Sequence, residues 1–310
     1  MSRLAAVSVD LDTLPHYLRI QGLEESLIDG HARTLVSKVA IGRFLELFDG
    51  KPATFFAIGE DVLDPKMTAG LQKAHAAGVE IASHSFRHDY ALSRQTPLRI
   101  ADDLAAAQEA IEAAVGVAPV GFRAPGYTLS PALLQAVANL GLSYDSSAFP
   151  AVPYYSAKAL VMGALRVAGR PSRAVLDSPR VLLAPRGPYR PDLLAPYSKG
   201  NAPLVELPMM VAPVTRLPFI GTFVTQMPWS LVKATYATFT RDPLLNFELH
   251  AIDVLDVSDG VPRALAAQQR DLNVPVREKL KRLKEVFAWL WSDGEPVTLA
   301  QASQRLASRL

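Results

Sequence analysis

The sequence predicts an α/β protein with a largely parallel sheet. Over the first 150 residues of the 310-residue chain, short apolar strands alternate with helical segments, as they do in successive βα units. The strands expected at 5–9, 52–58, 79–82 and 142–144 are mostly apolar, which is typical of strands whose two faces are both covered by helices. A barrel and a doubly wound sheet both fit this pattern, and in either fold the chemistry lies at the carboxyl ends of the strands.

The helices of this region share a start signal, in which an N-cap residue precedes a proline at the first helical position. The signal occurs at Asp64-Pro65, Thr96-Pro97 and Ser130-Pro131. Gly78 and Gly141 are expected as C-cap glycines, and each leads directly into a strand. A further helix is expected at about 32–48.

The second half of the chain begins with a long insertion. Residues 150–203 are rich in proline and tyrosine and show no clear period, so we expect a lid or a substrate-binding loop within a single catalytic domain of residues 1–310. Strands are expected at 204–210 and 246–250, with a helix from about Ser230. An amphipathic helix at 276–290 is expected to pack on the domain with its basic residues in solvent.

An apolar segment, 217–229, precedes the last of these strands. It belongs either to the buried core or to a pocket for an acyl or lipid-linked substrate, and we favour the core.

The composition excludes several kinds of site. The chain has no cysteine, so disulfides, thiolate zinc sites, iron–sulfur clusters and a cysteine nucleophile are excluded. A net charge of only +2 gives no electrostatic reason to expect nucleic acid binding. We expect a cytoplasmic protein, because the sequence shows neither a secretory leader nor a transmembrane run of about 18 apolar residues. Whether it forms a homo-oligomer is left open.

Two pairs of polar residues predict a metal site. Asp10 and Asp12 follow the first strand at alternate positions, so both carboxylates can point to one side, where they repel unless a cation lies beside them. His84 and His88 follow the third strand at a spacing that places both imidazoles on one face of a helical turn. Two histidines and one carboxylate form a ligand set that is typical of catalytic zinc.

Four motifs in this order resemble those of the polysaccharide deacetylases, the NodB-like carbohydrate esterases: Val9-Asp-Leu-Asp12, His84-Ser-Phe-Arg-His88, Arg123-Ala-Pro-Gly-Tyr127 and Leu249-His250. The resemblance covers residues 5–150 closely and 246–251 more loosely. It implies a distorted (β/α) barrel and a zinc-dependent hydrolase of an amide C–N bond. The implied substrate is a small molecule or a glycan that carries the N-acetyl group of an amino sugar, either free, in a polymer or linked to a lipid.

The resemblance also implies the metal ligands and the general base. Asp12, His84 and His88 would hold Zn²⁺ or another divalent transition metal. Asp10 would accept a proton from the attacking water, and Arg123 would pair with Asp10 and keep it ionised.

Other residues are implied to act on the leaving group, the oxyanion and the substrate. His250 would protonate the departing amine, with its ring oriented by Asp145 or by Asp253. The backbone N–H of Gly126 would donate to the oxyanion, because Pro125 has none. The substrate-binding residues implied are Tyr127, Ser147 and Phe149.

The first motif departs from the commonest family pattern, in which two aspartates are adjacent. The Asp-x-Asp spacing resembles a branch that includes peptidoglycan-deacetylase-like proteins and hydrolases of cyclic imides and allantoin, so a cyclic amide or ureide is an alternative substrate. Residues 9–14 also resemble the first motif of haloacid-dehalogenase-type phosphatases, which would use Asp10 and Asp12 with magnesium. A non-catalytic carbohydrate-binding relative is the remaining alternative.

Overall fold

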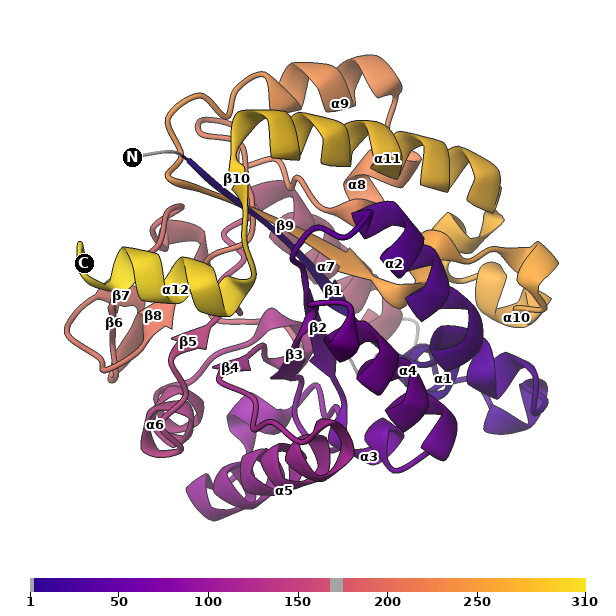
Figure 1. Cartoon of the computed structure of the whole chain (residues 1–310), viewed down its shortest axis with the longest axis horizontal. Coiled ribbons are helices and arrows are strands. Elements are labelled where there is room, and N and C mark those ends of the chain that lie inside the picture. Colours follow the sequence, from indigo (N-terminus) through magenta and orange to yellow (C-terminus); the bar gives the residue numbers. More distant parts are fainter. Residues whose placement is uncertain (1–2, 168–174) are drawn as a thin grey trace.

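The centre of the fold is a parallel sheet built around β1, Leu4–Asp10 (Figure 1). The computed structural model describes residues 3–167 and 175–310. In this part of the chain β1 pairs with β9 along its whole length and also with β10 and β2, after which the sheet continues through β3, β4 and β5 to β8. The remaining strands of the sheet are β2 Thr54–Ala57, β3 Glu80–Ser83, β4 Gly121–Phe122, β5 Tyr144–Asp145, β8 Val205–Glu206, β9 Leu244–His250 and β10 Glu295–Pro296.

The sheet curls into a distorted barrel, which confirms the fold implied by the sequence motifs. Irregular chain after β8 bridges to β9: the Met210 N–H donates to the Asn246 carbonyl over 3.1 Å, and the Asn246 side-chain amide donates to the Leu207 carbonyl over 2.8 Å. Because the strands are parallel, their carboxyl ends meet at one mouth of the barrel.

Helices pack around the outside of the sheet (Figure 1). The three predicted N-caps are confirmed, because the side chains of Asp64, Thr96 and Ser130 accept backbone N–H groups at the starts of α4, α5 and α6. The helices are α1 Leu14–Gln21, α2 Ile41–Phe48 with a π-helical turn Val36–Ala40 before it, α3 Gly59–Val62, α4 Pro65–Ala76, α5 Pro97–Val115, α6 Pro131–Asn139, α7 Val152–Val167, α8 Gly221–Gln226, α9 Trp229–Tyr236, α10 Arg263–Ala266, α11 Val276–Asp293 and α12 Leu299–Ala307.

The insertion at 150–203 is more regular than its sequence suggests. It begins with the four-turn helix α7, and it contains an antiparallel pair, β6 Pro191–Asp192 and β7 Ala195–Lys199. Residues 168–174 lie outside the described part of the chain. That the insertion acts as a lid stays a prediction.

Helix α11 is amphipathic as expected, but one of its lysines does not face solvent. Lys279 is fully buried, and its ammonium donates to the carbonyls of Ile252 and Leu255 over 2.9 and 2.7 Å. These carbonyls lie in and just after the short turn Ala251–Val254, which is too short to pair all of its own carbonyl groups. Lys279 therefore anchors the chain just beyond His250 to α11, and the expectation of solvated basic residues is wrong at this position.

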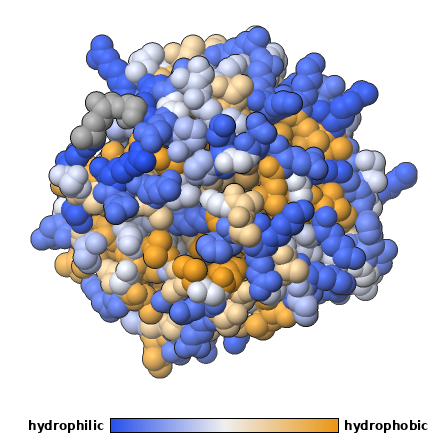
Figure 2. Space-filling model, viewed as in Figure 1, coloured by the Kyte–Doolittle hydropathy of each residue, from blue (hydrophilic) through white to orange (hydrophobic). Residues whose placement is uncertain are grey.

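The face of the molecule seen in Figure 2 is not divided into a polar and an apolar region. Figure 2 shows hydrophilic and hydrophobic residues interspersed over one face. None of the described helices combines the length and the hydropathy required to span a bilayer.

We expect Gly121→Ala to lower the free energy of unfolding by about 1–3 kcal/mol, as overpacking of a dense core does. An added Cβ would lie 1.9 Å from Cζ of Tyr144, a buried ring whose hydroxyl donates to Glu80 over 2.7 Å. Gly42→Ala in α2 is the matched control, because its Cβ would meet no atom within 4 Å and alanine gains about 0.5–1 kcal/mol in a helix. Urea unfolding measures both variants, and equal effects would contradict the close packing at β4.

Candidate active site

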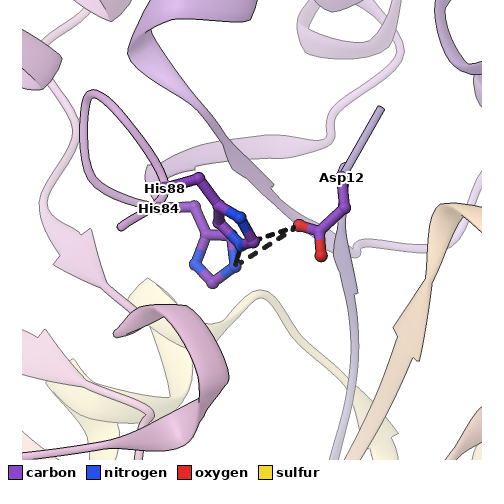
Figure 3. A group of neighbouring side chains, drawn as sticks. All are labelled: Asp12, His84 and His88. Carbon is purple, nitrogen blue, oxygen red and sulfur yellow. Dashed lines mark hydrogen bonds and ion pairs between the residues drawn. The ribbon is translucent and has the colours of Figure 1, made fainter. Parts of the chain in front are cut away.

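Asp12, His84 and His88 converge on one point at the mouth of the barrel (Figure 3). The Nε2 atoms of the two histidines lie 3.2 Å apart, and Oδ1 of Asp12 lies 3.5 Å from Nε2 of His84 and 3.3 Å from Nε2 of His88. Two atoms that bind one tetrahedral zinc ion at about 2.1 Å lie about 3.4 Å apart. The triangle therefore has the size that a shared metal ion requires.

His84 is in the protonation state that a metal ligand needs. Its Nδ1 lies 2.7 Å from the carbonyl oxygen of Arg123, and because a carbonyl only accepts, the proton is on Nδ1 and the Nε2 lone pair faces the triangle. Burial lowers the pKa of His84 to about 4, so the ring is neutral near pH 7.

Asp12 supplies the negative charge of the triangle. Burial opposes its ionisation, but His88, His84 and His250 together outweigh burial and hold the pKa of the carboxyl well below its usual range, with His88 contributing most. Its Oδ1 is buried and has no hydrogen-bond partner among the described residues. A buried carboxylate oxygen without a donor, facing a neutral imidazole nitrogen, fits a divalent cation.

The loop that carries His84 and His88 is not the helical turn that their spacing suggested. β3 ends at Ser83, and Ser85 and His88 adopt positive φ values of 67° and 52°, which a right-handed helix excludes. Side chains hold the loop instead. Ser85 Oγ accepts the His88 N–H over 3.0 Å, and Asp103 of α5 accepts the N–H groups of Phe86 and Arg87.

The ring of His88 is fixed by its neighbours. His16 and Tyr90 pack edge-on against it, with ring centroids 4.9 and 5.0 Å away. His16 in turn bonds Asp61 over 2.9 Å. Sequence spacing gave no reason to connect His16 with the site, because α1 brings it there only through the fold.

The expected contact between Asp10 and Arg123 is present and fully buried. Nη1 of Arg123 donates to Oδ1 of Asp10 over 2.6 Å, and the guanidinium lies 4.1 Å from the ring centroid of Phe56. The other nitrogens donate to Ser8 Oγ and to both the hydroxyl and the carbonyl of Ser146. Oδ2 of Asp10 has no hydrogen-bond partner among the described residues and lies 3.7 Å from Nε2 of His84.

The ring of His250 is oriented by Glu248, a residue that the motifs did not indicate. Nδ1 of His250 lies 2.9 Å from Oε1 of Glu248, and Nε2 lies 3.1 Å from the hydroxyl of Tyr127, which also bonds Glu248 over 3.1 Å. Burial opposes the charge on His250, but the carboxylates of Glu248, Asp10 and Asp12 together outweigh burial and hold the pKa of the imidazole well above its ordinary value, with Glu248 contributing most. Alternate positions of a strand share a face, so the two-residue spacing of Glu248 and His250 was the sequence signal that could have indicated their contact.

The two carboxylates expected to orient His250 have other partners. Asp253 accepts the backbone N–H of His250 over 2.9 Å and does not bond the ring. Asp145 accepts the Ser147 hydroxyl over 2.6 Å and is linked to the buried Glu206. The expectation that Asp145 or Asp253 holds the ring is therefore wrong.

Asp10, Glu248 and His250 form a second cluster of ligand atoms within 4.8 Å of one another. It is the poorer cation site, because the Arg123 guanidinium already occupies one oxygen of Asp10. A protonated His250 also has no lone pair to offer.

Of the expected substrate-binding residues, only Tyr127 lines the cavity above the site. Gly126 lines it as well. Both residues have φ near 62°, and a Cβ at Gly126 would lie 2.5 Å from Tyr90. Ser147 is buried with its hydroxyl between Asp145 and the Ala124 N–H, and Phe149 packs behind Tyr127. Neither of these two lines the cavity, so their expected role is not supported.

The cavity holds about 440 Å³, the size of a small-ligand pocket. Asp10, Asp12, His84, His88 and His250 lie at its catalytic end. The apolar segment 217–229 contributes both to the core, through Phe219, and to the cavity wall. The apolar and aromatic wall residues are Tyr17, Ile20, Tyr90, Tyr154, Pro218, Ile220, Phe223, Met227 and Ile252.

Comparison with known proteins identifies related chains. Residues 44–144 match the model of the polysaccharide deacetylase family. The chain is 29% identical over 156 residues to the peptidoglycan deacetylase of Helicobacter pylori, covering 49% of this chain and 52% of that protein. It is 29% identical over 147 residues to a peptidoglycan deacetylase-like protein of Gibberella zeae, covering 46% and 42%. The chain therefore spans about half the length of the curated relatives it matches.

A solved structure shares the whole fold. The crystal structure assigned to a polysaccharide deacetylase from Mycobacterium smegmatis has a TM-score of 0.62 at 18% identity, covering 100% of this chain and 92% of that chain. The segment matched by the family model contains His84, His88 and Arg123, whereas Asp10, Asp12 and His250 lie outside it.

We expect Arg123→Met to lower the free energy of unfolding by about 3–5 kcal/mol, because it leaves Asp10 charged and buried without its partner. Arg33→Met is the matched control. Its pair with Glu25 is 45% and 42% exposed, and such pairs contribute less than about 1 kcal/mol. Urea unfolding compares the two, and a loss below about 1 kcal/mol for Arg123→Met would contradict the role of this ion pair.

Proposed function

We propose that this chain, whose residues 44–144 match the polysaccharide deacetylase family, is a metal-dependent hydrolase that removes the acetyl group from an amino sugar or a glycan. The observation that carries the proposal is the triangle of Asp12, His84 and His88. Beside it lie Asp10, a carboxylate with one oxygen unpaired among the described residues, and His250, an imidazole whose pKa is raised well above its ordinary value. Hydrolysis of an amide needs this combination of a base, an acid and an electrophilic centre.

Asp12, His84 and His88 fit a divalent metal, and zinc is the metal we propose. Bound there, it would supply Lewis acidity, lowering the pKa of water and polarising the amide carbonyl. The remaining steps belong to the side chains around it.

Asp10 is the proposed general base. Arg123 holds one of its oxygens and leaves Oδ2 without a hydrogen-bond partner among the described residues. Asp10 lines the cavity, so that oxygen can take a proton from the attacking water. The Gly126 N–H, at the cavity wall, is the proposed donor to the oxygen that becomes negative.

His250 is the proposed general acid. With a proton on both nitrogens, its Nδ1–H donates to Glu248 and its Nε2–H points to the Tyr127 hydroxyl, which donates onward to Glu248. An amine leaves poorly as an anion, so a charged imidazole at the cavity wall supplies the proton that the departing nitrogen needs.

The alternative activities differ in how well they fit the site. A cyclic amide or ureide is hydrolysed by the same chemistry, and the small, largely apolar cavity suits a compact substrate, so this remains the second candidate. A magnesium phosphatase is disfavoured, because Asp10 is bonded to Arg123 and Asp12 faces two histidines. A non-catalytic relative is disfavoured by the complete set of base, acid and ligand side chains. A cytoplasmic location stays a prediction.

The proposal is tested by zinc content and by amine release from N-acetylglucosamine and its oligomers, compared with cyclic imides and allantoin. We expect close to one zinc per chain and release of glucosamine. His84→Ala is expected to lose the metal. Asp10→Asn is expected to keep it while turnover falls about 100- to 10,000-fold, the contribution of a general base. Loss of zinc in Asp10→Asn would contradict the division of roles, and turnover of cyclic ureides alone would favour the second candidate.

A pH profile tests the acid. General acid activity requires the protonated ring and is lost as the pH rises through the pKa of His250, which the Glu248 carboxylate raises. We expect Glu248→Gln to lower that pKa, to move the alkaline limb of kcat/KM to lower pH, and to reduce activity about 10- to 100-fold at pH 8.

Asp253→Asn is the matched control for the acid, because an asparagine oxygen can still accept the backbone N–H of His250. An alkaline limb that moves in Asp253→Asn and stays in Glu248→Gln would contradict the assignment of Glu248.

A further inference from the structure

The cavity above the candidate site contains a lysine side chain. Among the described residues that line this cavity, Lys158 is the one lysine, and none is an arginine. It reaches the cavity from α7, which lies outside the segment matched by the family model. Lys158 is therefore not explained by the chemistry of the site.

Lys158 has no directly paired counter-charge among the described residues. It forms no ion pair or hydrogen bond there, and its ammonium lies 5.8 Å from the ring centroid of Tyr154. The carboxylate of Asp177 acts on it only from a distance, because that group is engaged by the Tyr197 hydroxyl and the Ser178 N–H. Burial lowers the pKa of Lys158 to about 8, the direction expected of an ammonium that is partly removed from water without a partner.

The charges along the cavity are separated. Three carboxylates, those of Asp10, Asp12 and Glu248, lie at or beneath the catalytic end. Aromatic rings lead away from it in steps of similar length: 6.1 Å from His250 to Tyr127, 6.5 Å from Tyr127 to Tyr154, and 5.8 Å from the Tyr154 ring to the Lys158 ammonium. These carboxylates are balanced by Arg123, by the charged His250 and by the proposed metal, whereas the Lys158 ammonium has no paired anion among the described residues, so an anionic substituent is attracted to the Lys158 end.

We infer that Lys158 binds an anionic group of the substrate, a carboxylate or a phosphate, while the amide of the same molecule reaches Asp10 and His250. This inference rests on the proposed function for the position of the amide. One small molecule can contact both ends, because the cavity has the volume of a single ligand site. Lys158 then determines specificity and orientation, and it takes no part in the bond cleavage.

Three N-acetylated probes test the inference: neutral N-acetylglucosamine, its 6-phosphate, and N-acetylmuramic acid, which carries a carboxylate. We expect the zinc-loaded protein to prefer at least one anionic probe in kcat/KM. Lys158→Met should reduce kcat/KM for that probe about 10- to 100-fold, the contribution of a charge-assisted hydrogen bond, and change it less than about threefold for the neutral sugar. Lys158→Arg should retain the preference. Lys73→Met, on the exposed face of α4, is the control for loss of a positive charge.

The outcomes separate this inference from the proposed function. No preference for either anion, or an equal loss for neutral and anionic probes in Lys158→Met, overturns it. If no probe releases an amine, calorimetric binding of the same three probes decides: weaker binding of an anionic probe to Lys158→Met than to the parent protein supports the anion site, and equal binding overturns it. Comparison of the phosphate with the carboxylate probe identifies which anion the site prefers.

Discussion

The buried contact between Arg123 and Asp10 is the interaction on which the rest of the site depends. A guanidinium that is fully removed from water is tolerated only when its donors are satisfied. Its partners here come from β1, through Ser8 and Asp10, and from Ser146 after β5, with Phe56 of β2 packed against its face. The backbone carbonyl of Arg123 also accepts the Nδ1 proton of His84. One residue thus fixes strand positions, orients the proposed base and sets the tautomer of a proposed metal ligand.

The site holds two histidines in different protonation states. His84 is buried, and its Nδ1–H donates to the carbonyl of Arg123. Burial therefore keeps its imidazole neutral, and the lone pair on Nε2 is free. His250 lies beside Glu248, whose charge contributes most to outweighing burial and keeping the imidazole protonated. A neutral ring can coordinate and a charged ring can donate a proton, and local environment alone makes the difference.

The parts of this molecule that the sequence predicted well are those determined by local patterns. The N-caps at Asp64, Thr96 and Ser130 depend on neighbouring residues, and the ordered motifs placed the proposed metal residues together. The parts that it predicted poorly depend on tertiary contacts. The conformation of the His84 loop depends on hydrogen bonds to Asp103 of the later helix α5. Helix α7 forms within a proline-rich segment that shows no helical period in its sequence. Lys279 is buried because its ammonium donates to backbone carbonyls that follow β9. Glu248 was within reach of sequence reasoning, since it is two positions from His250 on one strand face.

The pairing of β1 with β9 has a consequence for how the protein is made. Asp10 stands in register with His250, about 240 residues later in the chain, and closing so long a loop is slow and entropically costly. During synthesis β1 emerges first and keeps an open edge until β9 follows. Asp12, His84 and His88 all lie within the first 88 residues. The nascent chain can therefore bring these three side chains together before the proposed proton donor is synthesised, so assembly of the proposed active site ends with the strand that carries His250.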